Sequence, residues 1–162
     1  MVLVSSHFQG IYEVLMMIKK IATLLGLSAI SVMALAADPL HGTKWKTIDD
    51  QTKKPLSIVE FHEAPNGVLT AKIVDVLTPG EAESCAKCVG KFHNKPLKGV
   101  QIVTGLKNTG KQSYDGGKIT DPKNGKTYSF NAKLSSDRQT LNGRGYIGVS
   151  ALGRSQTWIR AN

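Results

Sequence analysis

The fold is predicted from one stretch of sequence, Gly116-Gly-Lys-Ile-Thr-Asp-Pro-Lys-Asn-Gly-Lys-Thr-Tyr128. Asp121-Pro122 begins a turn, because proline restricts its own φ and pushes the residue before it towards extended geometry. Asn124-Gly125 continues the turn, since both residue types tolerate positive φ and favour tight hairpins. Residues 117–120 lead into the turn and residues 126–134 lead out of it with the pattern of a strand. The stretch therefore predicts a β-hairpin.

The outgoing strand of this hairpin alternates strictly between two kinds of side chain. Successive residues of a strand point to opposite faces of the sheet, so alternation of this kind predicts one buried face. The predicted buried face carries Tyr128, Phe130, Ala132 and Leu134, and the opposite face carries Thr127, Ser129, Asn131 and Lys133.

The rest of the chain after residue 43 repeats these signals, as short apolar or alternating runs separated by turn residues. Strands are predicted over residues 44–49, 56–61, 68–77, 100–104, 117–120, 126–134, 139–147 and 155–160. Residues 78–97 form a long polar loop that contains both cysteines, and residues 105–112 are predicted to be a linker rich in Gly, Asn and Lys.

About eight strands without a helical period predict an all-β protein. The simplest arrangement is a small closed antiparallel barrel, because closure removes the exposed sheet edges. A sandwich of two sheets is the alternative. The interior of so small a barrel is either filled by side chains or leaves room for one small ligand. Gly143, Gly145 and Gly148 suit the sharp bends of a barrel.

The first 36 residues are predicted to be a leader that contains a signal peptide. Lys19-Lys20 is a short positive segment, residues 21–35 are nearly all apolar, and Ala34-Leu35-Ala36 has the small-x-small form of a cleavage site. An uncleaved membrane anchor is the alternative, but the apolar run is shorter than the roughly 20 residues that a spanning helix needs. The sequence therefore predicts a domain over residues 37–162 that is exported to the periplasm.

The true start of the protein is predicted to be Met16 or Met17. A secretory leader normally begins with its positive residues, whereas residues 1–16 contain no lysine or arginine and include Glu13.

The chain is basic, with 21 Lys and Arg against 12 Asp and Glu and a formal net charge of +9. Nucleic acid is not expected as a partner, because an exported protein seldom meets it. An acidic envelope surface, such as phosphate-bearing lipid, is the partner that this charge would suit. The alternative is a surface whose scattered lysines only confer solubility.

Several motifs in a fixed order closely resemble the bacterial family called domain of unknown function 2147. They are the run from Gly42 through Trp45 to Asp50, Cys85-x-x-Cys88, Gly117 to Tyr128, Gly145-Tyr-Ile-Gly148, and Gly153-Arg-x-Gln-x-Trp158-x-Arg160. The resemblance implies a lipocalin-like barrel, export to the periplasm in most members, and binding of a small ligand.

The lipocalin resemblance also implies a pair of residues that closes one end of the barrel. Lipocalins place an arginine of the last strand over a tryptophan of the first, and Arg160 and Trp45 match that pair. A cation–π contact of this kind contributes about 0.5–2 kcal/mol. The sequence departs from the lipocalin Gly-x-Trp motif, because it has Gly42-x-x-Trp45.

Cys85 and Cys88 are predicted to form a disulfide, because exported proteins usually oxidise a cysteine pair. The ring is small, so the chain-entropy model predicts only about 2 kcal/mol of stabilisation, and the bridge would mainly hold the long loop. The alternatives are a redox-active pair or a metal site that recruits His93 and His62. Haem attachment would need a histidine directly after Cys88, where Val89 stands.

No motif points to catalysis or to a cofactor. The sequence has no Gly-x-Ser-x-Gly elbow and no phosphate-binding loop before a helix. Asp49-Asp50 is a candidate carboxylate pair, but Asp49 is better explained as a residue that ends a strand and accepts hydrogen bonds from the turn that follows. Asp121 is explained in the same way.

The cavity of the barrel is predicted from the aromatic and polar residues of the later strands. The predicted cavity residues are Trp45, Tyr128, Phe130, Arg144, Tyr146 and Trp158. An inward Arg144 would need a carboxylate or an anionic ligand, because an unpaired buried charge is costly. The alternation of this strand equally allows Arg144 to point outward.

The leading functional hypothesis is that the protein is not an enzyme but a periplasmic binding protein for a small apolar or amphiphilic ligand. That ligand would be anionic if Arg144 points inward. One alternative is an envelope interaction protein with a filled barrel, and another is a redox or metal protein built on the two cysteines. No metal and no cofactor is assigned under the leading hypothesis.

Overall fold

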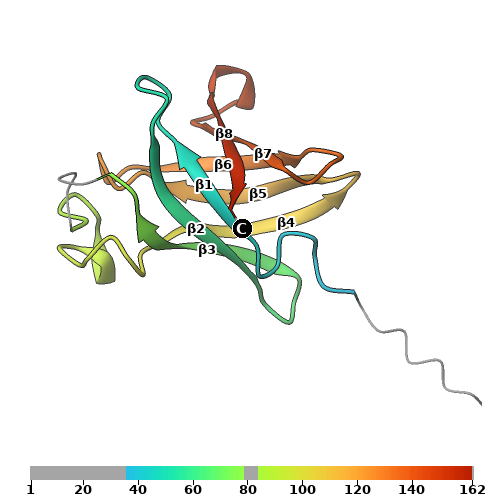
Figure 1. Cartoon of the computed structure of the whole chain (residues 1–162), viewed down its shortest axis with the longest axis horizontal. Coiled ribbons are helices and arrows are strands. Elements are labelled where there is room, and N and C mark those ends of the chain that lie inside the picture. Colours follow the sequence, from blue (N-terminus) through green and yellow to red (C-terminus); the bar gives the residue numbers. More distant parts are fainter. Residues whose placement is uncertain (1–35, 79–83, 162) are drawn as a thin grey trace, which may run out of the picture. The chain divides into compact units, whose positions relative to one another are not determined.

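Eight β-strands, each antiparallel to the next, form the part of the protein that the computed structural model describes, residues 36–78 and 84–161 (Figure 1). They are β1 (Lys44–Ile48), β2 (Pro55–Glu63), β3 (Val68–Val76), β4 (Gln101–Gly110), β5 (Ser113–Thr120), β6 (Thr127–Leu134), β7 (Thr140–Tyr146) and β8 (Arg154–Ala161). Because β8 also pairs with β1, the sheet closes into a barrel. This confirms the predicted all-β barrel and excludes the sandwich.

The described residues contain two short 3-10 helices, η1 (Gly90–Phe92) and η2 (Ser150–Leu152), in the connections that precede β4 and β8. No helix among them is long and apolar enough to cross a membrane. The predicted signal peptide, its positive segment and the two candidate start residues lie outside the described residues.

The predicted hairpin is β5, a turn at residues 121–126, and β6. In the turn, the backbone N–H of Asp121 donates to the carbonyl of Lys126 at 2.9 Å, and the Asp121 carboxylate accepts from the N–H of Lys123 at 2.9 Å. Gly125 has a φ of 71°. Along β6 the burial alternates as the sequence predicts, with Phe130 buried and Lys133 exposed.

The predicted linker over residues 105–112 is wrong. These residues complete β4 and turn directly into β5 through Lys111 and Gln112, whose φ values are 50° and 61°. Two consecutive residues with positive φ give the twist of a tight hairpin, but Lys and Gln are not the residues that usually occupy such positions. The composition of the stretch therefore indicated a loop, whereas pairing with the neighbouring strands makes it sheet.

One end of the barrel is closed by Trp45 and Arg160, which lie directly opposite each other on β1 and β8. The indole of Trp45 is fully buried, and the Arg160 guanidinium carbon lies 5.4 Å from its ring centroid. The indole Nε1–H donates to Thr43 Oγ1 at 2.7 Å, and that hydroxyl donates to the carbonyl of Leu40 at 2.6 Å. The structure thus brings the predicted closure pair together.

The segment before β1 completes this closure. Leu40 is fully buried, and its N–H donates to the carboxylate of Asp38 at 2.8 Å. The same carboxylate accepts from the Tyr114 hydroxyl at 3.1 Å and from Asn108 Nδ2 at 2.6 Å. Burial, followed by the charge of Asp38, raises the pKa of Tyr114 well above its ordinary value. Asp38 therefore holds the N-terminal segment against β4 and β5.

Replacing Asp38 with Ala should lower the free energy of unfolding by roughly 1–3 kcal/mol, because the partly buried Tyr114 hydroxyl and the exposed Asn108 amide lose their acceptor. Urea unfolding followed by circular dichroism would measure the change. Asp75→Ala is the control, since Asp75 is exposed on β3 and should change stability by less than about 0.5 kcal/mol. Equal effects of the two substitutions would contradict the role given to Asp38.

Candidate ligand-binding cavity

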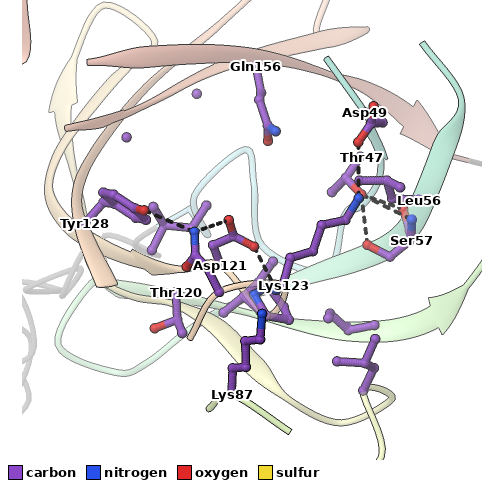
Figure 2. Close-up of a pocket in the computed structure, with 18 of the residues that line it drawn as sticks. Thr47, Asp49, Leu56, Ser57, Lys87, Thr120, Asp121, Lys123, Tyr128 and Gln156 are labelled. Atoms are coloured by element: carbon purple, nitrogen blue, oxygen red, sulfur yellow. Dashed lines mark hydrogen bonds and ion pairs between the residues drawn. The ribbon is translucent and has the colours of Figure 1, made fainter. Parts of the chain in front are cut away.

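A cavity of about 590 Å³ opens at the end of the barrel opposite Trp45. Figure 2 shows residues that line it. Its rim is formed by the connections β1–β2, β3–β4 and β5–β6 and by the start of β8. An up-and-down barrel places alternate connections at opposite ends, so these belong to one end of the barrel. The cavity is therefore open on one side and closed at the other by the packed core around Trp45.

The floor of the cavity is apolar. The ring of Phe130 on β6 stacks on Trp158 of β8 with centroids 6.0 Å apart and an interplanar angle of 25°, and both side chains are buried. Trp158 also contacts Phe61, with centroids 6.2 Å apart. Further apolar lining comes from Ile73, Val76, Leu97, Ile102 and Ile119.

The space above this floor depends on two glycines of β7. A Cβ added at Gly143 would lie 2.7 Å from Cε2 of Phe130, so Gly143 makes room for that ring. A Cβ at Gly145 would meet Ile119 Cγ2 at 3.6 Å, which is an ordinary contact. Both glycines line the cavity, and a larger side chain at Gly145 would project into it.

The mouth is polar, and an ion pair crosses it. Lys123 Nζ, from the β5–β6 turn, donates to Asp49 Oδ2 at the end of β1 over 3.2 Å (Figure 2). The backbone N–H of Thr52, followed by the Lys123 ammonium, holds the pKa of Asp49 well below its usual range. The contact across the mouth therefore persists as pH falls through the ordinary pKa of an aspartate. Asp49 also accepts hydrogen bonds from the turn as the sequence predicts, at 2.8 Å from the Thr52 N–H.

Other polar side chains at the mouth are paired with one another. Asn124 Nδ2 donates to Asp121 Oδ2 at 2.9 Å and to the Tyr128 hydroxyl at 3.2 Å (Figure 2). Deeper in the cavity, the Trp158 indole N–H donates to Gln156 Oε1 at 3.3 Å. Across the described residues no buried side-chain nitrogen or oxygen lacks a partner. The arrangement suits a molecule with an apolar part inside and a polar part at the mouth.

One wall of the mouth is built from the disulfide loop. Cys85 and Cys88 are joined and buried, and the Sγ of Cys85 lies 3.9 Å from the carbonyl of Pro122. A Cβ at Gly125 would lie only 1.7 Å from the carbonyl oxygen of Lys87, so the β5–β6 turn packs tightly against this loop. The disulfide thus constrains the part of the β3–β4 connection that packs against the neighbouring turn.

The two histidines considered for a metal site do not join the cysteines. His93 Nδ1 lies 3.0 Å from the backbone carbonyl of Cys88, and His62 lies on β2 next to His41, with ring centroids 5.2 Å apart. Within residues 36–78 and 84–161 no group of three or more His, Cys, Asp or Glu residues is arranged to hold a metal ion.

The predicted cavity residues fall into two groups. Tyr128, Phe130 and Trp158 line the cavity. Trp45 does not, because it lies in the packed core at the closed end.

The placement of Arg144 and Tyr146 in the cavity is wrong. They alternate with the lining glycines of β7 and so lie on the outer face of the barrel. Arg144 instead donates to the carbonyl of Ser150 at 2.6 Å, the carbonyl of Ala151 at 2.9 Å and Ser155 Oγ at 2.7 Å. These three oxygens satisfy the Arg144 guanidinium on the outer face, which avoids the cost of burying an unpaired charge among the apolar side chains of the cavity floor.

Sequence reasoning missed two contributions to the site. The glycine face of β7 was explained by strand bending, although alternation of glycine with large residues also signals space inside a barrel. Asp49 and Asp121, which line the cavity, were explained mainly as turn residues, and Lys123 was given no role. These residues also lie at the rim of a cavity, because closure of the barrel brings their turns together at one end.

A closed eight-stranded antiparallel barrel with an apolar cavity open at one end is the architecture of a lipocalin-like protein. The chain belongs to the bacterial family described as "Uncharacterized protein conserved in bacteria (DUF2147)", which matches residues 43–160. This confirms the family resemblance noted in the sequence.

A solved structure supports the same class. The chain is similar to protein HP1028 from the human pathogen Helicobacter pylori, described as belonging to the lipocalin family, with a TM-score of 0.65 and 30% sequence identity over 76% of this chain and 83% of that chain. No curated protein matches the sequence.

Replacing Gly125 with Ala should destabilise the protein and loosen the disulfide loop. A left-handed backbone costs a residue with a Cβ roughly 1–2 kcal/mol, and the clash with Lys87 adds to that cost. Gly67→Ala is the matched control, because Gly67 has a φ of 76° but its nearest neighbouring atom would be 3.9 Å away. Urea unfolding would give the two costs, and amide hydrogen exchange over residues 84–100 would rise only in Gly125→Ala. Equal costs and equal exchange in both variants would contradict the tight packing of the turn.

Proposed function

We propose that this protein is a periplasmic binding protein, not an enzyme, that holds a small apolar or amphiphilic molecule in the barrel cavity. The observation that carries the proposal is a cavity of about 590 Å³ with an apolar aromatic floor and a polar mouth. Sites for small molecules generally fall between about 300 and 1,000 Å³, with mostly apolar linings and a few polar groups that orient the ligand.

The lining indicates how a ligand would lie. An alkyl chain or ring would rest on Phe130 and Trp158, where each buried methylene contributes about 0.8 kcal/mol. A polar head would stay at the mouth beside Lys87, Lys123 and Arg154. Since Arg144 lies outside, a preference for an anionic head depends on these three cations, of which Lys123 contacts Asp49 and Arg154 contacts Asp50.

The periplasmic location is supported by the signal-peptide pattern of residues 19–36. The Cys85–Cys88 disulfide agrees with it, because disulfides persist in oxidising compartments. The same bridge argues against a redox protein, since thiol exchange needs an accessible sulfur and these residues are only 0% and 3% exposed. The open cavity argues against an interaction protein with a filled barrel.

Gly145→Leu should weaken binding of an alkyl ligand by about tenfold or more, because the leucine occupies space that several methylenes would fill. Dodecanoate is the probe, and its binding would be followed through the fluorescence of Trp158 on the cavity floor. Thr104→Leu is the control, since Thr104 is exposed on the outer face of β4. Comparison with dodecanol would show how much the carboxylate contributes.

Native mass spectrometry of protein purified from cells that express the full chain should also show a co-purified lipid-sized molecule in the wild type and less of it in Gly145→Leu. If a folded Gly145→Leu variant binds dodecanoate as tightly as the wild type, the cavity is not the binding site.

A further inference from the structure

The connection from β7 to β8 exposes three large apolar side chains to solvent. Ile147, Val149 and Leu152 are 72%, 60% and 83% exposed. Val89, on the β3–β4 connection, is 79% exposed. Of the five large apolar side chains that are exposed among the described residues, four therefore lie on connections at the open end of the barrel, and only Ile159 lies on a strand. In Figure 1 the red β7–β8 connection projects beyond the strands.

This connection is held in place rather than free to turn its apolar residues inward. Arg144 donates to the carbonyls of Ser150 and Ala151 in η2, and Asn131 Nδ2 donates to Ser150 Oγ at 3.2 Å. At Gly153 an added Cβ would lie 2.7 Å from the carbonyl oxygen of Gly145, so the chain is packed closely against β7. A supported loop that exposes apolar side chains indicates a surface that is covered in use.

The charge around the open end indicates what covers it. Among the described residues, the connections at this end, residues 49–54, 77–78, 84–100, 121–126 and 147–153, contain eight lysines and three acidic residues. The β7–β8 connection itself has no charged residue. At the closed end, residues 36–43, 64–67, 111–112 and 135–139 contain equal numbers of basic and acidic residues. The positive excess therefore lies on the side of the cavity mouth.

We infer that the open end of the barrel docks on a membrane surface that contains anionic phospholipid, with Ile147, Val149 and Leu152 inserted among the headgroups. Apolar side chains beside lysines match this boundary, because lysine can bury its stem while its ammonium stays with the phosphates. The orientation brings the cavity mouth to the bilayer, the source of an amphiphilic ligand. The inference rests on the proposed function for its purpose, but membrane binding can be tested separately.

Vesicle co-sedimentation tests the docking, with protein purified from cells that express the full chain. The probes are vesicles of phosphatidylcholine alone and vesicles in which about a third of the lipid is phosphatidylglycerol. The wild type should prefer the anionic vesicles, and added salt should weaken that binding. The combined variant Ile147→Ser, Val149→Ser and Leu152→Ser should partition about tenfold or more weakly, because each substitution removes an apolar side chain from the headgroup region. Ile159→Ser is the control and should bind like the wild type.

A second measurement reports insertion directly. In a Leu152→Trp variant, the new indole should shift its emission to shorter wavelength on anionic vesicles and be quenched by brominated acyl chains. Trp45 is buried at the closed end, and Trp158 is only 1% exposed, so it is reached only by an acyl chain that enters the cavity. Quenching in the wild type should therefore be much weaker.

The outcomes separate this inference from the proposed function. Gly145→Leu should keep vesicle binding while it loses dodecanoate, and the triple serine variant should keep dodecanoate binding in solution while it loses vesicles. Vesicle binding that is absent in the wild type, or unchanged in the triple variant, would overturn the docking. A concentration-dependent dimer that disappears in the triple variant would also overturn it, since a second copy of the chain would then cover the loop.

Discussion

The structure depends on the pairing of β1 with β8, which turns a sheet of eight strands into a barrel. This pairing is short, with three register pairs, and its central pair is Trp45 opposite Arg160. The indole is buried beneath the guanidinium, and the Asp38–Leu40 segment packs at the same end. Closure leaves no sheet edge exposed to another chain. It also forces the interior space to open at the other end, so the position of the cavity follows from the position of this contact.

A single strand links the cavity to the loop at its rim. Along β7, Gly143 and Gly145 face inward and leave space above Phe130, while Arg144 between them faces outward and holds η2 through two backbone carbonyls. Because side chains alternate between the two faces of a strand, consecutive residues of β7 contribute to different features, the cavity inside and the loop outside. The strand that borders the cavity also supports the apolar loop beside the mouth, which is a physical reason for the two features to occur together.

The polar turns at the mouth stabilise the fold and also line the cavity. Asp49 and Asp121 accept hydrogen bonds within their own turns, and the first of them also contacts Lys123 across the opening. The disulfide loop packs against the second turn at Gly125. A rim built from such well-satisfied groups can present charge to a ligand without large rearrangement, because its side chains are already held by neighbours. The cysteines contribute by holding this wall, which agrees with their burial.

The sequence by itself determined the strand count and the central hairpin, because alternation and turn chemistry are local properties. The residues that close the barrel came from the resemblance to lipocalins, which implies the pair Trp45 and Arg160. The sequence failed for residues 105–112, where a hairpin turn is made by Lys111 and Gln112 and pairing with β3 and β5 overrides a loop-like composition. It also left the inner face of β7 undecided. Period two defines two faces, but which one points inward depends on the register with neighbouring strands, in which Gly145 lies opposite Phe130. Only the tertiary structure decided that glycines rather than Arg144 face the interior, and so that there is a cavity at all.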